Sequence, residues 1–182
     1  MQKPTSDAHR LFFALWPDEP TCTQLERAAR AVSLEDDSGG RPTNPARYHV
    51  TLQFLGDFSP WPEALFDRAA RAAQKVRVPA FDLVLDTTGS FGGGRVWWLG
   101  CSSMPPALES LWNLLGAELA AHDVPVRAHP QFTPHLTIRR NARRRLAPRC
   151  VEAVRWPIRE FVLMDSQPDA GYRELARWPL QA

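Results

Sequence analysis

The chain has 182 residues, of which 44% are hydrophobic, and a formal net charge of +2 at pH 7. This length suits one domain, or two small lobes that share a core, and every apolar run is far shorter than the ~18 residues that a membrane helix needs. A net charge this small does not by itself indicate a nucleic-acid partner. Three cysteines, an odd number without metal-ligand spacing, favour reduced thiols. We therefore expect a cytoplasmic protein with no membrane contact.

Hydrophobic periodicity predicts seven strands and three helices. In chain order they are a strand at 11–16, a helix at 20–32, a strand at 48–55, a helix at 62–76, strands at 81–87 and 95–101, a helix at 106–122, and strands at 132–138, 158–164 and 172–178. This mixed order is typical of an α+β fold with antiparallel sheets flanked by helices. We expect one domain over residues 1–182, in which two antiparallel sheets share a concave face.

Two tetrapeptides share one pattern: His49-Val50-Thr51-Leu52 and His135-Leu136-Thr137-Ile138. Each lies in a predicted strand, where successive side chains point to opposite faces. The His and the Thr of each tetrapeptide therefore share one face, and the two apolar residues point to the core. Because the pattern occurs twice in similar settings, we expect the two strands to contribute to one site.

Two imidazoles and two hydroxyls in one cleft suit acid–base chemistry on a phosphate. Histidine titrates near neutrality, so one imidazole can accept a proton while the other donates one. Threonine hydroxyls can hydrogen-bond the phosphate oxygens, and an arginine can add a charge-assisted, forked contact. This arrangement requires neither a metal nor another cofactor.

Simpler explanations of these residues are open as well. A single histidine in a strand is more often structural than catalytic, and threonine is a common strand former. A zinc site at His129 and His135 would lack further ligands at the usual spacing. We assign His9 and His122 to the surface or to helix ends.

Residues 124–151 contain seven arginines but neither Asp nor Glu. The arginines are Arg127, Arg139, Arg140, Arg143, Arg144, Arg145 and Arg149. Such a stretch raises the local positive potential and would attract phosphates. Arginine also outnumbers lysine 20 to 2 over the whole chain, so a general compositional bias is the alternative explanation.

Aromatic side chains often stack on RNA bases. Phe12, Phe54 and Trp97 are candidates for this role, but their strand patterns favour the core. Trp61 lies in a predicted loop, where we expect it to be exposed.

Five segments resemble one known family, and together they cover almost the whole chain. They are Arg10-Leu11-Phe12-Phe13-Ala14-Leu15-Trp16, Tyr48-His49-Val50-Thr51-Leu52-Gln53-Phe54-Leu55-Gly56, Arg95-Val96-Trp97-Trp98-Leu99-Gly100, Phe132-Thr133-Pro134-His135-Leu136-Thr137-Ile138-Arg139-Arg140 and Tyr172-Arg173-Glu174-Leu175-Ala176-Arg177-Trp178-Pro179-Leu180. The chain resembles the 2H phosphoesterase superfamily. The resemblance is strongest to the RNA 2′,3′-cyclic phosphodiesterase family, also called the 2′-5′ RNA ligase family.

The resemblance implies a two-lobed fold, pseudo-twofold with a central cleft. It also implies a metal-independent enzyme that opens RNA 2′,3′-cyclic phosphate ends to 2′-phosphomonoesters. It implies that His49 is the general acid and His135 the general base, although the near symmetry of the motifs leaves their order open. Thr51 and Thr137 would hold phosphate oxygens. The resemblance also implies that the partner is RNA, and some members of the family join RNA ends in reverse through 2′-5′ linkages. We expect a monomer, although the sequence leaves the oligomeric state open.

The family has an arginine five residues after the second histidine, which is Arg140 in this chain. An ideal strand would instead place Arg139 on the face of His135 and Thr137, whereas a bulge would turn Arg140 inward. We expect Arg140 to contact the phosphate, with Arg139 as the second candidate. Two further functions are open: an RNA-binding module without catalysis, and a cyclic phosphodiesterase for small nucleotide metabolites.

Overall fold

The structure is a computed structural model that describes residues 8–35, 39–126, 131–168 and 170–181. The helices are α1 (Glu19–Glu35), α2 (Glu63–Ala73) and α3 (Pro106–Ala121), with short 3₁₀ turns η1 (Pro45–Arg47) and η2 (Gly92–Gly94). The strands are β1 (His9–Leu15), β2 (Arg41–Pro42), β3 (Val50–Phe58), β4 (Phe81–Phe91), β5 (Val96–Gly100), β6 (His135–Arg140), β7 (Arg149–Ile158), β8 (Glu160–Gln167) and β9 (Gly171–Pro179). Among the described helices, none is long and apolar enough to cross a membrane.

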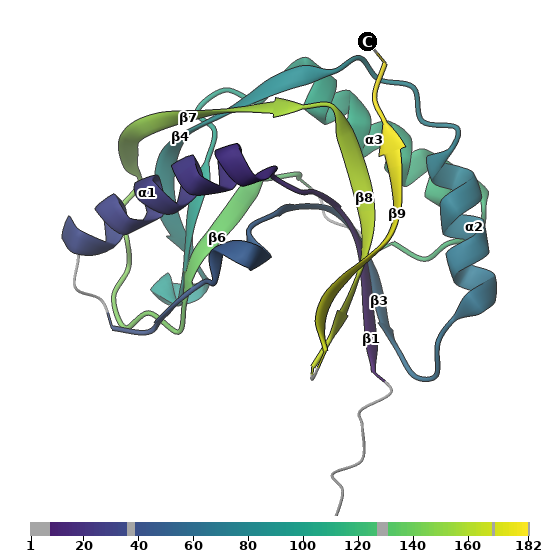
Figure 1. Cartoon of the computed structure of the whole chain (residues 1–182), viewed down its shortest axis with the longest axis horizontal. Coiled ribbons are helices and arrows are strands. Elements are labelled where there is room, and N and C mark those ends of the chain that lie inside the picture. The colour runs from purple at the N-terminus through teal and green to yellow at the C-terminus, as the bar shows by residue number, and fades with distance from the viewer. Residues whose placement is uncertain (1–7, 36–38, 127–130, 169, 182) are drawn as a thin grey trace, which may run out of the picture.

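The strands form one continuous sheet in the order β7-β4-β5-β6-β3-β1-β8-β9, with β2 beside β6. All of its strand pairings are antiparallel, so the predicted α+β class is confirmed. The two sheets that we expected are two halves of this one sheet, which meet where β3 pairs with β6. Figure 1 shows the halves diverging, with α1 across one half and α2 and α3 beside the other.

The sequence prediction missed one long strand, β7, which lies in the stretch expected to be an arginine-rich loop. Its buried residues alternate along its second half, at Val154, Trp156 and Ile158. The proline at position 157 is unusual within a strand, because it cannot donate a hydrogen bond to a neighbour. It is accommodated here because β7 is an edge strand, where proline is tolerated.

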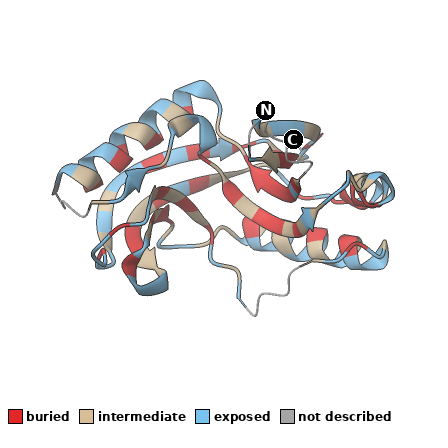
Figure 2. Ribbon diagram, turned by 90° about the horizontal axis from the view of Figure 1, so that it is seen from below, coloured by how far each residue is buried: buried red, intermediate tan, exposed pale blue. Residues whose placement is uncertain are grey.

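Most of the core lies between the helices and one face of the sheet (Figure 2). The helices bury the stripes that their sequences predict, such as Leu108, Leu111, Leu115 and Leu119 of α3. A second, smaller cluster lies apart from this core and consists of Phe12, Ala14, Val162 and Met164, against which Trp16, Phe54 and Tyr172 pack. Strands β1 and β8 are therefore apolar on both faces.

His9 is buried, which corrects its expected place at the surface. Its Nδ1 lies 2.8 Å from Oδ2 of Asp165, a carboxylate with no exposed surface. Its ring meets the Trp61 ring edge to face at a centroid distance of 5.1 Å, so Trp61 is half-buried rather than exposed. His122 caps the C-terminal end of α3, as expected. His129 and Arg127 lie outside the described residues.

Candidate active site

The two halves of the sheet meet at Val50 of β3, which pairs with Leu136 of β6. Both side chains are fully buried, so their sequence neighbours point to the opposite face. Antiparallel register, continued by one residue each way, puts His49 across from Thr137 and Thr51 across from His135. The two histidines then occupy diagonal positions, whose Cβ atoms are typically somewhat less than ~7–8 Å apart, a separation that a phosphate group can bridge.

Two cavities adjoin this junction, and both are lined by His49, Arg140 and Tyr172. The first, which we call the arginine arm, has a volume of about 430 Å³ and is completed by Arg41, Pro42, Thr43, Asn44, Arg47, Thr137 and Asn141. The second, which we call the aromatic arm, has a volume of about 310 Å³ and is completed by Arg10, Phe12, Thr51, Phe54 and Asp57. The two arms form one cleft centred on His49 and Arg140.

His135 is not part of the lining of either arm. Its ring packs edge to face on Phe91 at a centroid distance of 4.8 Å, on the β6 side of the junction. It is nevertheless close enough to His49 for its positive charge to help lower the pKa of His49. The structure therefore gathers His49, Thr51, Thr137 and Arg140 along the cleft, whereas His135 lies near His49 but outside the lining of both arms.

The two histidines are held in the same way by their own strands. Nδ1 of His49 lies 2.7 Å from the carbonyl oxygen of Arg47, and Nδ1 of His135 lies 2.8 Å from that of Thr133. A carbonyl oxygen only accepts, so each Nδ1 carries the hydrogen and donates it. This leaves Nε2 of each ring to accept or donate a proton.

Both imidazoles are uncharged at neutral pH in the free protein. Burial lowers the pKa of His49 to about 4; the hydrogen bond from Nδ1 to the Arg47 carbonyl opposes this, and the charges of Arg140 and His135 lower it further. Burial also lowers the pKa of His135, again with a contribution from Arg140. A bound phosphate brings negative charge and would raise both pKa values.

Three aromatic side chains surround the His49 ring and fix its position. Trp16 stacks on it at a centroid distance of 5.4 Å with an angle of 5° between the planes. Phe12 and Tyr172 approach at 5.1 and 5.7 Å. The sequence prediction missed the roles of Trp16 and Tyr172. One feature of the sequence did indicate a second apolar surface. Both the odd and the even positions of residues 11–16 are apolar, so other side chains had to pack on both faces of this strand.

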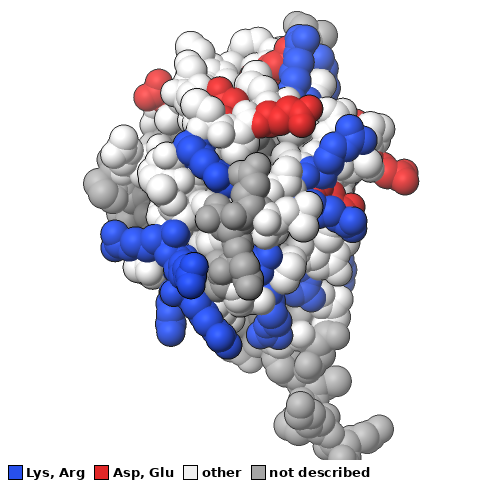
Figure 3. All heavy atoms as spheres, turned by 90° about the vertical axis from the view of Figure 1, so that its left-hand side faces the viewer, with Lys and Arg blue, Asp and Glu red and all other residues white. Residues whose placement is uncertain are grey.

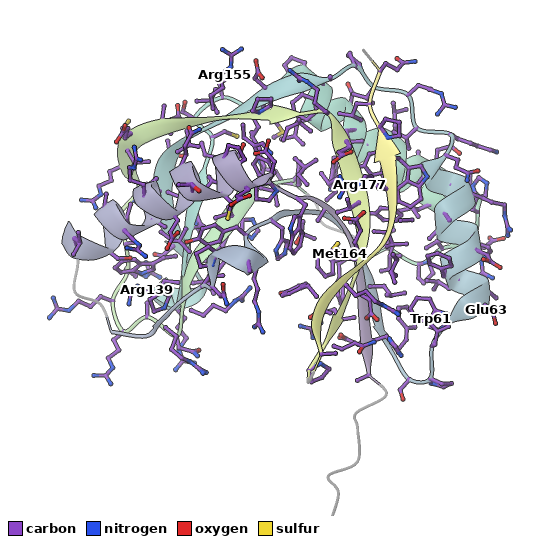
Figure 4. All side chains as sticks on the ribbon, viewed as in Figure 1. Trp61, Glu63, Arg139, Arg155, Met164 and Arg177 are labelled. Carbon is purple, nitrogen blue, oxygen red and sulfur yellow. The ribbon has the colours of Figure 1, made fainter. Side chains whose placement is uncertain are left out.

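A bulge in β6 decides between the two arginine candidates. Trp98 of β5 pairs with Thr137, but the preceding Trp97 pairs with Arg139, so Ile138 is an extra residue. This shift reverses the alternation and turns Arg140 into the cleft. Arg139 lies on the other side, below α1 in Figure 4, where its Nη1 donates to the carbonyl oxygen of Gly39 at 2.7 Å. Arg139 therefore lines neither arm, and Arg140 is the arginine that we carry forward as the candidate phosphate ligand.

A second bulge, in β3, reverses the direction that the strand pattern predicts for Phe54. Ala14 of β1 pairs with Thr51, whereas Phe13 pairs with Gln53, so Leu52 is the extra residue. Gln53 turns into the core and donates from Nε2 to the carbonyl oxygen of Trp112 at 3.0 Å. Phe54 turns to the aromatic arm.

Only some arginines of the arginine-rich stretch, residues 124–151, lie at the site. Arg140 lines both arms, while Arg143, Arg144 and Arg145 are exposed outside them. Figure 3 shows cations gathered on the lower part of one face of the molecule and acidic residues towards its upper part. Trp97, one of the three stacking candidates, is buried and donates from Nε1 to the Arg144 carbonyl oxygen, so it belongs to the core.

Known proteins resemble this chain over nearly its full length. The sequence profile of the 2′-5′ RNA ligase superfamily matches residues 17–170. A protein of Escherichia coli K12 named RNA 2′,3′-cyclic phosphodiesterase is 32% identical over 187 residues, covering 96% of this chain and 98% of its own. A Thermus thermophilus protein of the same name is 31% identical and covers 87% of this chain and 82% of its own. The crystal structure of E. coli LigT with 3′-AMP superposes with a TM-score of 0.80 at 28% identity, covering 96% of this chain and 99% of that one.

Proposed function

Because the chain belongs to the 2′-5′ RNA ligase superfamily, we propose that it hydrolyses RNA 2′,3′-cyclic phosphate ends to 2′-phosphomonoesters. The observation that carries this proposal is the junction of β3 and β6. There, two imidazoles and two threonines from distant parts of the chain share the face of the sheet that bears the cleft.

In the proposed reaction His135 acts as the base and His49 as the acid. Nε2 of His135 takes a proton from water as the water oxygen bonds to phosphorus. The negative charge of the bound substrate favours the doubly protonated form of His49. The bond between phosphorus and O3′ breaks, and Nε2–H of this imidazolium protonates O3′ to give a free 3′-hydroxyl and a 2′-phosphate. The reverse order of roles is the alternative, since both rings present Nε2 in the same way.

Thr51, Thr137 and Arg140 would hold the non-bridging phosphate oxygens. Negative charge on these oxygens grows as water adds, so a guanidinium fixed beside them stabilises the transition state more than the ground state. Acid, base and counter-charge are all side chains in this scheme. We therefore propose a metal-independent reaction, in which turnover persists in EDTA.

The aromatic arm is suited to the terminal base. Phe54 is partly exposed there beside the buried Phe12. The Arg10 guanidinium lies over Phe54 at 5.9 Å, and its Nε donates to Asp57 at 2.7 Å. Stacking on aromatic rings tolerates every base. End joining would use the same site, with an RNA 5′-hydroxyl replacing water and giving a 2′-5′ linkage.

We further propose that the enzyme works as a monomer in the cytoplasm. The site draws all of its proposed groups from a single chain. Cys22, Cys101 and Cys150 are free thiols, as suits a reducing compartment.

The experiment that tests the function compares wild type with His49→Ala and His135→Ala on RNA ending in a 2′,3′-cyclic phosphate. We expect each substitution to lower kcat/KM ~10²–10⁴-fold, as for the loss of one proton transfer. Wild-type rates in both variants would contradict the proposal. An RNA-binding module without catalysis would instead bind the RNA in a salt-sensitive way and leave its end unchanged.

A further inference from the structure

The arginine arm carries more positive charge than the reacting phosphate needs. Arg140 lies at its inner end with His49 and Thr137, but Arg41 and Arg47 line the same cavity, and no acidic side chain lines it. Within the part of the chain that the structure describes, none of these three arginines forms an ion pair. Their charges are therefore available to an anionic ligand.

Strand β2 holds two of these arginines against each other. Arg41 pairs directly with Arg140 across the β2–β6 ladder. Like charges at opposite positions of an antiparallel pair repel and destabilise it. The backbone N–H of Thr43, which donates to the carbonyl oxygen of Ile138 at 2.8 Å, ties the segment down beside β6. An anion bound between the two guanidinium groups would replace this repulsion with attraction.

Arg47 already has contacts within the protein that position it beside the cleft. It ends η1, whose start is capped by the Asn44 side chain, which accepts the Ala46 N–H at 3.0 Å. The Arg47 guanidinium lies over the Tyr172 ring at 5.6 Å, and its carbonyl oxygen is the one that holds His49. Because the side chain already has a partner surface, less conformational entropy is lost when it meets an anion.

We propose that residues 41–47 bind the phosphodiester on the 5′ side of the terminal nucleotide. The reacting cyclic phosphate would lie where the two arms meet, and the terminal base in the aromatic arm. The RNA chain would then leave through the arginine arm, where Arg41 and Arg47 meet its next phosphate. This inference rests on the proposed function and narrows its substrate class to RNA ends of at least two nucleotides, in preference to nucleoside 2′,3′-cyclic phosphates.

The test uses the full chain and three substrates with a 2′,3′-cyclic phosphate: a mononucleotide, a dinucleotide, and the same dinucleotide with an uncharged methylphosphonate linkage. We expect wild type to prefer the charged dinucleotide over the other two by about tenfold or more in kcat/KM. In the double variant Arg41→Ala/Arg47→Ala this preference ratio should collapse towards one. Arg144→Ala removes an exposed arginine outside both arms and should keep the wild-type ratio.

Circular dichroism and melting curves of the double variant show whether it is folded, and residual turnover of the mononucleotide shows whether its catalytic centre is intact. Equal turnover of the charged and uncharged dinucleotides by wild type would overturn the inference while the proposed function stands. Failure of wild type to cleave any of the three substrates would overturn both the inference and the proposed function.

A free nucleotide is the other source of a phosphate anion for the arginine arm. If ATP inhibits mononucleotide turnover by wild type but not by the double variant, and linkage charge has no effect, the arm binds free polyphosphate and the RNA assignment is wrong.

Discussion

Val50 lies directly opposite Leu136, and this one pairing aligns the two halves of the cleft. Both side chains are fully buried, so the histidine and the threonine beside each of them point away from the core. A slip of one residue between the strands would turn the whole set inward. The apolar residues of the two motifs are therefore as necessary for the site as the polar ones.

The pH dependence of turnover should reflect two lowered histidine pKa values. The reaction needs one ring protonated and one neutral, so kcat/KM should be bell-shaped with its maximum between the two values of the free enzyme. Both lie below the ordinary value of 6.5, which puts the maximum on the acid side of pH 6.5. The maximum of kcat should lie at higher pH, because bound phosphate raises both values.

Initial rates measured from about pH 3.5 to about pH 9, at low and at saturating substrate, give the two profiles. A maximum of kcat/KM above pH 6.5 would show that the two histidine pKa values are not lowered in the free enzyme. As a control, the ring signals of the free protein can be titrated by NMR, which reports the pKa values without turnover.

Arg140 and Arg139 form a matched pair of adjacent arginines, of which only Arg140 reaches the cleft. Arg140→Lys keeps the charge but loses the forked contact with two phosphate oxygens, so we expect kcat to fall ~10-fold or more. Arg139→Lys should lose the bond to the Gly39 carbonyl and the contact with the Trp97 ring at 5.6 Å. Its effect should be on stability, with kcat near that of wild type.

Steady-state kinetics and melting temperatures of both variants separate these effects. A larger loss of kcat in Arg139→Lys than in Arg140→Lys would mean that the bulge at Ile138 does not set which arginine reaches the phosphate.

The buried contact between His9 and Asp165 should contribute to stability rather than to turnover. Asp165 also accepts from Nε2 of Gln167 at 2.8 Å, but it has no exposed surface, so His9→Ala leaves a carboxylate with fewer partners. We expect the free energy of unfolding to fall by ~1–3 kcal/mol. The neighbouring Arg10→Ala removes an exposed ion pair with Asp57 and should cost less, ~0–1 kcal/mol.

Urea unfolding followed by circular dichroism measures both changes. If His9→Ala is no more destabilising than Arg10→Ala, the buried pair does not have the role described above.

The strands that carry the two motifs could be predicted from alternation alone, but the faces of the residues after them could not. Bulges at Leu52 and Ile138 each reverse the alternation, and a bulge depends on the register of the partner strand, which is distant in sequence. The family resemblance indicated Arg140 where ideal strand geometry indicated Arg139. The same effect moved Phe54 to the cleft, where strand parity had put it in the core.

The rest of the cleft wall comes from segments that carry no local signal of function. Arg41 and Arg47 lie in a stretch whose composition is typical of a polar loop, and Tyr172 follows a turn near the end of the chain. They reach His49 because β2 pairs with β6 and because β8 and β9 complete the sheet beyond β1. Sheet order of this kind depends on long-range pairing, which a single sequence does not reveal.

The central claim is a specific change at the end of an RNA chain, and phosphorus NMR of the product tests it most directly. An oligonucleotide with a 2′,3′-cyclic phosphate, incubated with the enzyme in EDTA, should give the resonance of a 2′-phosphomonoester. With His49→Ala or His135→Ala the cyclic phosphate resonance should persist. A 3′-phosphomonoester, or an unchanged cyclic phosphate with the wild-type enzyme, would contradict the account.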